Sequence, residues 1–169
     1  MERLDDIAAT ARFFARAISK FGCSGASGTI RVLDFECGSG HLVKELLSYG
    51  YDAYGCDTNL DRSAGERCRE IGTAPYRLPF ENDFFDVVLS TSVLEHARNP
   101  HEYLAEIRRV LKPNGVAMHL FPGKWYLPRE PHILVPLANY FYARICGLRC
   151  GLFCGAVLPN TNAGAGGTR

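Results

Sequence analysis

A glycine-containing turn between two short apolar runs constrains the fold of this chain more than any other feature. The segment 31–42 reads RVLDFECGSGHL, in which an apolar run enters a turn that contains Gly38 and Gly40. A second apolar run, 52–56, ends at Asp57. This order predicts a buried strand, a turn that opens a helix, and a second strand that ends in a carboxylate. An α/β domain builds a pocket for a nucleoside with a polar tail in this way.

The turn departs from the pattern of dinucleotide-binding proteins. Their fingerprint is Gly-x-Gly-x-x-Gly, and its third glycine allows the helix to pack closely on the strand. Here Val43 occupies that third position. A nicotinamide-dependent oxidoreductase therefore stays only as an alternative.

Apolar periodicity gives the order of the predicted elements. Continuous apolar runs alternate with segments of helical spacing, which predicts a parallel sheet covered on both faces by helices. A Gly/Ser loop is expected over 22–28 and a weak strand or loop over 73–78. We predict helices over 3–20, 40–48, 59–71, 100–111 and 132–147, and strands over 29–34, 52–56, 84–90 and 116–121.

Four further motifs follow in a fixed order. The chain reads LPF at 78–80, FDVV at 85–88, LEH at 94–96 and RVLKPNG at 109–115. Together with the acidic glycine turn, they resemble the class I S-adenosylmethionine-dependent methyltransferases, in particular the type 11-like group, over about residues 30–122. The resemblance implies an α/β, Rossmann-like fold, S-adenosylmethionine as the cofactor, and methyl transfer as the reaction.

The resemblance also implies where the cofactor binds. The turn holds the methionine part, Asp34 positions the turn and the amino group, and Asp57 binds the ribose. The structural alternative for Asp34 is a carboxylate that caps a helix or stabilises a turn. The alternative for Ser90 and Thr91 is a polar turn after a buried strand. The predicted cofactor-binding residues are Asp34, Glu36, Cys37, Gly38, Gly40, Asp57, Thr58, Tyr76, Ser90 and Thr91.

Two of these positions depart from the family pattern. Glu36 stands where the family has its first turn glycine, so its side chain either crowds the cofactor or interacts with the cofactor's amino or sulfonium group. We predict that it weakens cofactor binding without abolishing it. The acid that relatives place near the adenine amine is absent, because this chain reads Ala74-Pro75-Tyr76 there. Contacts to the adenine are then expected from Tyr76 or from backbone groups.

The chain is predicted to be a truncated form of the family fold. We place the methyltransferase domain at 1–150, with its core at 29–122, and an apolar and then Gly/Ala-rich disordered tail at 151–169. No pair of strands follows residue 121, so the usual C-terminal antiparallel hairpin is expected to be missing. An unpaired sheet edge is a template for self-association. The main alternative function is a truncated or degenerate domain that binds the cofactor or a partner without turnover.

Charge and composition limit the partners. Lysine and arginine number 19 against 18 acidic residues, which gives no electrostatic footprint for nucleic acid or a membrane surface. We expect no signal segment at the N-terminus and no membrane span, and the seven cysteines fit reduced thiols, so a cytoplasmic location is expected. No metal site is predicted. A small-molecule, saccharide or lipid-linked acceptor is expected, with Glu130 and His132 as the weak candidates for accepting its proton.

Overall fold

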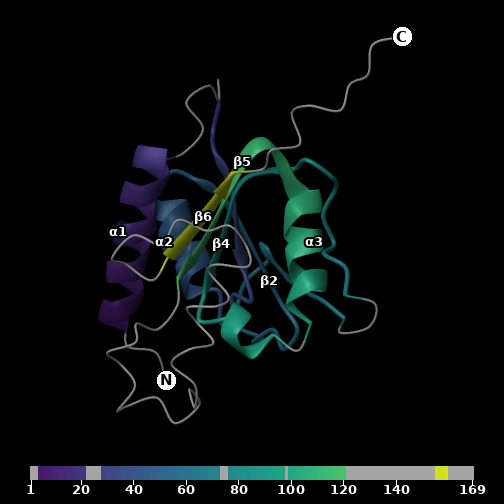
Figure 1. The fold of residues 1–169 in the computed structure, drawn as a ribbon. Coiled ribbons are helices and arrows are strands. Elements are labelled where there is room, and N and C mark those ends of the chain that lie inside the picture. The colour runs from purple at the N-terminus through teal and green to yellow at the C-terminus, as the bar shows by residue number, and fades with distance from the viewer. Residues whose placement is uncertain (1–3, 22–27, 73–75, 98, 121–154, 160–169) are drawn as a thin grey trace, which may run out of the picture.

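The computed structural model describes residues 4–21, 28–72, 76–97, 99–120 and 155–159 (Figure 1). Helices and strands alternate along most of this length, as the apolar periodicity predicts. The elements are α1 (Leu4–Phe21), β1 (Arg31–Phe35), α2 (His41–Ser48), β2 (Asp52–Asp57), β3 (Cys68–Glu70), β4 (Phe85–Thr91), the 3-10 helix η1 (Leu94–His96), α3 (Pro100–Val110), β5 (Leu111–Leu120) and β6 (Gly155–Pro159).

One sheet organises the described residues. Its strand order is β3-β2-β1-β4-β5-β6, with β1 to β5 parallel and β6 antiparallel to β5. Helices α1 and α2 lie on one side of this sheet and α3 lies on the other (Figure 1). The predicted Rossmann-like fold is therefore confirmed.

The core forms on both faces of the sheet, because successive strand residues point to opposite sides. In β1, Val32 packs in the cluster that contains Phe14 of α1 and Leu46 of α2. Its neighbour Leu33 packs in the other cluster, with Ile107 of α3. All five of these side chains are buried, and the strands are therefore apolar on both faces.

The helix predicted over 59–71 is wrong. This segment contains turns and then the short strand β3. Asp57 accepts the backbone N–H of Asn59 at 2.7 Å, and Asp61 accepts the N–H of Ser63 at the same distance. Short acidic side chains that bind backbone two residues ahead form turns and compete with helical hydrogen bonding.

The strand predicted over 116–121 is longer at its start. It begins at Leu111, directly after α3, and includes the Lys-Pro-Asn-Gly stretch that reads as a turn. Asn114 has a φ of 67° there, and the pairing register with β4 shifts between Phe85 and Val87. An irregular strand start tolerates the proline and asparagine that a regular central strand excludes.

The far edge of β5 is paired, contrary to prediction. Residues Val116–Leu120 pair with Pro159–Gly155 of β6, which lies within the segment 151–169 that the predicted domain excludes. The structural reason for expecting self-association through β5 is therefore gone. The predicted helix over 132–147 and the predicted disorder of 160–169 lie outside the described residues. None of the described helices has the length and apolarity needed to cross a membrane.

Candidate functional site

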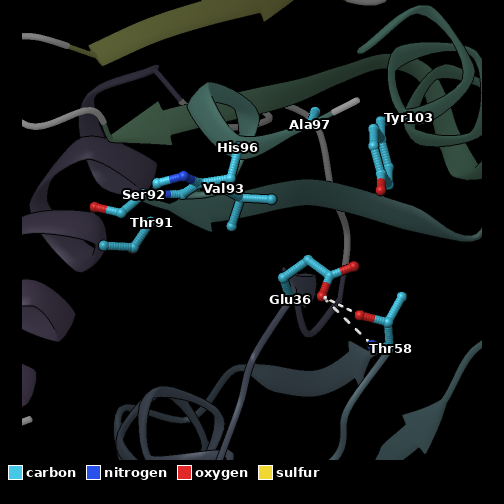
Figure 2. A pocket seen from close by; sticks show the side chains of 8 residues that line it. All are labelled: Glu36, Thr58, Thr91, Ser92, Val93, His96, Ala97 and Tyr103. Atoms are coloured by element: carbon cyan, nitrogen blue, oxygen red, sulfur yellow. Dashed lines mark hydrogen bonds between the residues drawn. The ribbon is translucent and has the colours of Figure 1, made fainter. Parts of the chain in front are cut away.

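A pocket of about 310 Å³ lies beside the carboxyl ends of β1, β2 and β4 (Figure 2). Open α/β sheets place their ligands at this edge. The volume falls at the small end of ligand pockets, which run from roughly 300 to 1,000 Å³. The residues that line it are Glu36, Thr58, Thr91, Ser92, Val93, His96, Ala97 and Tyr103.

The glycine turn packs closely against β2 and against the segment that precedes β3. Gly40 has a φ of 68°, and a Cβ there would lie 2.7 Å from the carbonyl oxygen of Ala64, so glycine is required both by backbone and by space. The turn also rests on β2, because a Cβ at Gly55 would lie 2.6 Å from Cys37 Sγ and 2.9 Å from Cys68 Sγ. Burial raises the pKa of the Cys37 thiol, which is therefore protonated and unreactive at neutral pH.

Asp57 ties the end of β2 to the glycine turn. Its Oδ2 accepts the backbone N–H of Gly38 at 2.6 Å, and its Oδ1 accepts the N–H of Asn59 at 2.7 Å. The side chain is buried and is not among the residues that line the pocket. A carboxylate has about four lone-pair sites, so these two bonds leave room for further donors. The ribose-binding role of Asp57 remains a prediction.

Glu36 is the residue of the turn whose side chain faces the pocket (Figure 2). Its backbone has a φ of 60°, a left-handed conformation that costs a non-glycine residue roughly 1–2 kcal/mol. The carboxylate accepts the Tyr76 hydroxyl at 2.9 Å, the Thr58 hydroxyl at 3.2 Å and the Thr58 N–H at 3.4 Å. Burial raises the pKa of Glu36; these hydrogen bonds oppose the rise, and the neighbouring charge of Asp57 adds to it.

Tyr76 is buried, and its hydroxyl donates a hydrogen bond to Glu36. Its ring packs edge-on against Phe35 of β1 and Tyr103 of α3, with ring centroids 6.1 Å and 4.1 Å away. Burial is the main reason that the pKa of its hydroxyl is raised, so the phenol stays neutral and donates to the carboxylate. Tyr76 does not line the pocket. The adenine contact expected of it remains a prediction, and what the structure shows is a positioning contact to Glu36.

The end of β4 carries the two hydroxyl residues predicted to face the cofactor, and they have different surroundings. Ser90 is buried, and its Oγ lies 2.8 Å from Nδ1 of His119 in β5. Burial lowers the pKa of His119 to about 4, so this core histidine is neutral. Thr91 lines the pocket, and its Oγ1 is buried without a hydrogen-bond partner among the described residues. An unsatisfied buried hydroxyl favours a polar group on a ligand.

A half-buried ion pair fixes the loop that carries Tyr76. Arg109 of α3 pairs with Glu106, with Nη2 at 2.7 Å from Oε2. The same guanidinium donates to the carbonyl oxygens of Leu78 and Phe80, and Glu106 accepts the N–H of Leu78. The LPF and RVLKPNG motifs therefore form one structural unit that holds the loop against α3.

The structure brings together only part of the predicted set. Glu36, Thr58 and Thr91 line the pocket, while Asp34 is buried in β1 and the catalytic candidates Glu130 and His132 lie outside the described residues. Sequence reasoning missed Tyr103 as a site residue. A signal was available, because residues 103, 107 and 110 share one face of α3 and the latter two are buried. The other unpredicted lining residues surround the LEH motif: Ser92, Val93, His96 and Ala97.

Fold and site together define a Rossmann-like domain with a ligand pocket beside a glycine turn. Residues 33–119, just over half of the chain, match the methyltransferase domain family model. The chain is 36% identical over 97 residues to the ubiquinone biosynthesis O-methyltransferase of Roseobacter denitrificans, covering 52% of this chain and 39% of the relative. It is 33% identical over 140 residues to that of Maricaulis maris, covering 66% and 55%.

Solved structures agree in fold. A SAM-dependent methyltransferase from Aquifex aeolicus superposes with a TM-score of 0.61 at 14% identity, covering 94% of this chain and 99% of the other. One from Archaeoglobus fulgidus gives 0.61 at 20% identity, covering 85% and 69%.

The chain belongs to the methyltransferase domain family. The predicted family and its cofactor, S-adenosylmethionine, are confirmed. The chain spans about half the length of the curated relatives it matches. The residues present fit the cofactor: Glu36, with its acceptor oxygens, lines a pocket beside the glycine turn, and so does Thr91, whose buried Oγ1 has no hydrogen-bond partner among the described residues.

Proposed function

We propose that this protein transfers a methyl group from S-adenosylmethionine to a hydroxyl oxygen of a small or lipid-linked acceptor. The observation that carries the proposal is the pocket at the carboxyl ends of β1, β2 and β4, beside the glycine turn of a methyltransferase-family domain. The choice of oxygen is supported by the relatives named as ubiquinone biosynthesis O-methyltransferases.

In this proposal, the turn and the strand ends bind the cofactor. Gly38 and Gly40 let the backbone approach the cofactor, and Glu36 and Asp57 accept hydrogen bonds from it. The hydroxyl of Thr91 forms a hydrogen bond with the cofactor. S-adenosylmethionine supplies a methyl group already activated on a sulfonium sulfur. The chain's own residues therefore have mainly to hold cofactor and acceptor in line and to exclude water.

A radiochemical assay tests the proposal. The whole chain is incubated with methyl-labelled S-adenosylmethionine and a panel of catechols with and without a polyprenyl tail, and the label is followed into the extracted acceptor. Cofactor binding is measured separately by calorimetry. Binding together with label transfer is the expected result. A chain that binds no cofactor overturns the proposal.

The second candidate is a domain that binds the cofactor or a partner without turnover. The observation that favours it is Glu36, an acid with a strained backbone at a turn position where the family has glycine. Binding without label transfer to any acceptor supports this candidate over catalysis. Transfer by the chain excludes it.

A further inference from the structure

The pocket contains the carboxylate of Glu36, which forms no ion pair with any side chain that the structure describes. Among the described residues, no Lys, Arg or His forms an ion pair with Glu36, and its hydrogen bonds come from the neutral groups of Tyr76 and Thr58. Asp57 lies close enough to raise the pKa of Glu36 further. Within the described part of the chain, Glu36 therefore has no ion-pair partner at this wall of the pocket, which His96 also lines.

Keeping this carboxylate has two costs in the ligand-free protein. Its backbone is left-handed, a conformation that glycine adopts freely, and half-burial removes part of its hydration. A buried charge is stabilised when an opposite charge approaches it. The structure offers that position to the ligand, because Glu36 lines the pocket rather than lying beneath it (Figure 2).

We propose that Glu36 makes this pocket distinguish the charged methyl donor from the uncharged thioether that remains after transfer. The proposal rests on the proposed use of S-adenosylmethionine. Donor and spent product share the adenosine and the amino-acid tail, and they differ by one methyl group and one positive charge on sulfur. A carboxylate in the pocket acts on that charge difference, favouring entry of the donor and release of the product.

The charge effect of Glu36 is separable from its bulk. The side chain takes up room that a glycine would leave empty, and this weakens both ligands alike. The ratio of the two affinities cancels that shared loss and isolates the charge. Gln at the same position keeps the shape and removes the charge, while Gly removes both.

Calorimetric titration at neutral pH tests the proposal without turnover. The ligands are S-adenosylmethionine, S-adenosylhomocysteine and sinefungin, which carries an ammonium group in place of the sulfonium. The proteins are the wild-type chain, Glu36→Gln, Glu36→Gly and, as a control for net charge, Glu66→Gln. Glu66 is exposed in the turn segment before β3 and does not line the pocket. Circular dichroism checks that each variant is folded.

We expect the wild-type chain to bind the two charged ligands about tenfold more tightly than the thioether, a difference of about 1.4 kcal/mol. Glu36→Gln and Glu36→Gly should reduce this ratio to within about threefold of unity, and Glu66→Gln should leave it unchanged. An unchanged ratio in both folded Glu36 variants overturns the inference alone. Failure of all three ligands to bind the wild-type chain overturns the proposed function together with it.

Discussion

Glu36 and Glu106 are two half-buried carboxylates that hold the same loop but differ in their partners. Glu106 accepts the N–H of Leu78 and pairs with Arg109, and these contacts lower its pKa. Among the described residues, Glu36 accepts hydrogen bonds from the neutral groups of Tyr76 and Thr58, and burial raises its pKa. The comparison teaches that the structural carboxylate, Glu106, is neutralised by an arginine. The pocket carboxylate, Glu36, has no such partner among the described residues, and in our proposal it interacts with the positive charge of the ligand.

The largest expected effect is a loss of stability when the Glu106–Arg109 ion pair is broken. Arg109→Met should lower the free energy of unfolding by about 2–3 kcal/mol, because it leaves Glu106 without its cation and two backbone carbonyls without their donor. Urea unfolding at neutral pH measures the loss. Arg108→Met is the matched control, since Arg108 is exposed on the same helix, and should change stability by less than about 0.5 kcal/mol. Equal losses in both variants would contradict the role of the ion pair.

The same substitution at both carboxylates compares them directly. Glu106→Gln should cost about 2 kcal/mol, because Arg109 loses a charged partner at 2.7 Å. Glu36→Gln should cost about 1 kcal/mol, because no described cation depends on it but the amide replaces one of the two oxygens that accept hydrogen bonds from Tyr76 and Thr58. Urea unfolding of the two variants in parallel measures the difference. A Glu36→Gln loss as large as that of Glu106→Gln would make Glu36 a structural residue.

A smaller effect is expected from removing the hydrogen bond that Tyr76 donates to Glu36. Tyr76→Phe removes the hydroxyl that donates at 2.9 Å and should lower stability by about 1 kcal/mol. The same change should raise the pKa of Glu36, because this hydrogen bond favours the charged form. Thermal unfolding gives the stability and carboxyl NMR titration gives the pKa. Tyr54→Phe is the control, since its hydroxyl lies 3.4 Å from Asp52 and is a weak donor.

The smallest expected effect is on the pH dependence of stability, to which Glu106 and Glu36 contribute with opposite signs. The pKa of Glu106 is lowered on folding, so the stability it contributes is fully present above its ordinary value of 4.5 and is lost as pH falls through the folded value. The pKa of Glu36 is raised, so the folded state binds its proton more tightly and stability falls as pH rises from 4.5 through the folded value. Unfolding of wild type and each Gln variant from about pH 3 to about pH 8 gives difference curves of opposite slope. Parallel curves would contradict the comparison.

The sequence predicted the sheet well and its peripheral segments poorly. Apolar runs and motif order located β1, β2 and β4, because buried parallel strands read as continuous apolar segments. The segment 59–71 failed because Asp57 and Asp61 bind nearby backbone groups and form turns. The pairing of β6 with β5 depends on residues far apart in the chain, and no local pattern predicts such a contact.

At the site, sequence reasoning identified the turn but not the protein contacts of the predicted side chains. Asp57 was expected to bind the ribose, which stays a prediction, and its carboxylate accepts the backbone N–H groups of Gly38 and Asn59. Ser90 was expected to face the cofactor, which also stays a prediction, and its hydroxyl contacts His119 in the core. Motif position fixes the backbone of such residues. Which way each side chain points depends on neighbours from other strands.

Gly55 has a consequence for how this site can be altered. The residue is part of β2, is absent from the pocket wall, and leaves no room for a methyl group beneath Cys37. A side chain there would have to displace the side chains of Cys37 and Cys68, and Cys37 belongs to the glycine turn, so a substitution away from the pocket wall would still affect the pocket. Strand β2 thus limits how closely the glycine turn can pack against the sheet, and the substitutions that position 55 tolerates measure how much room the turn has.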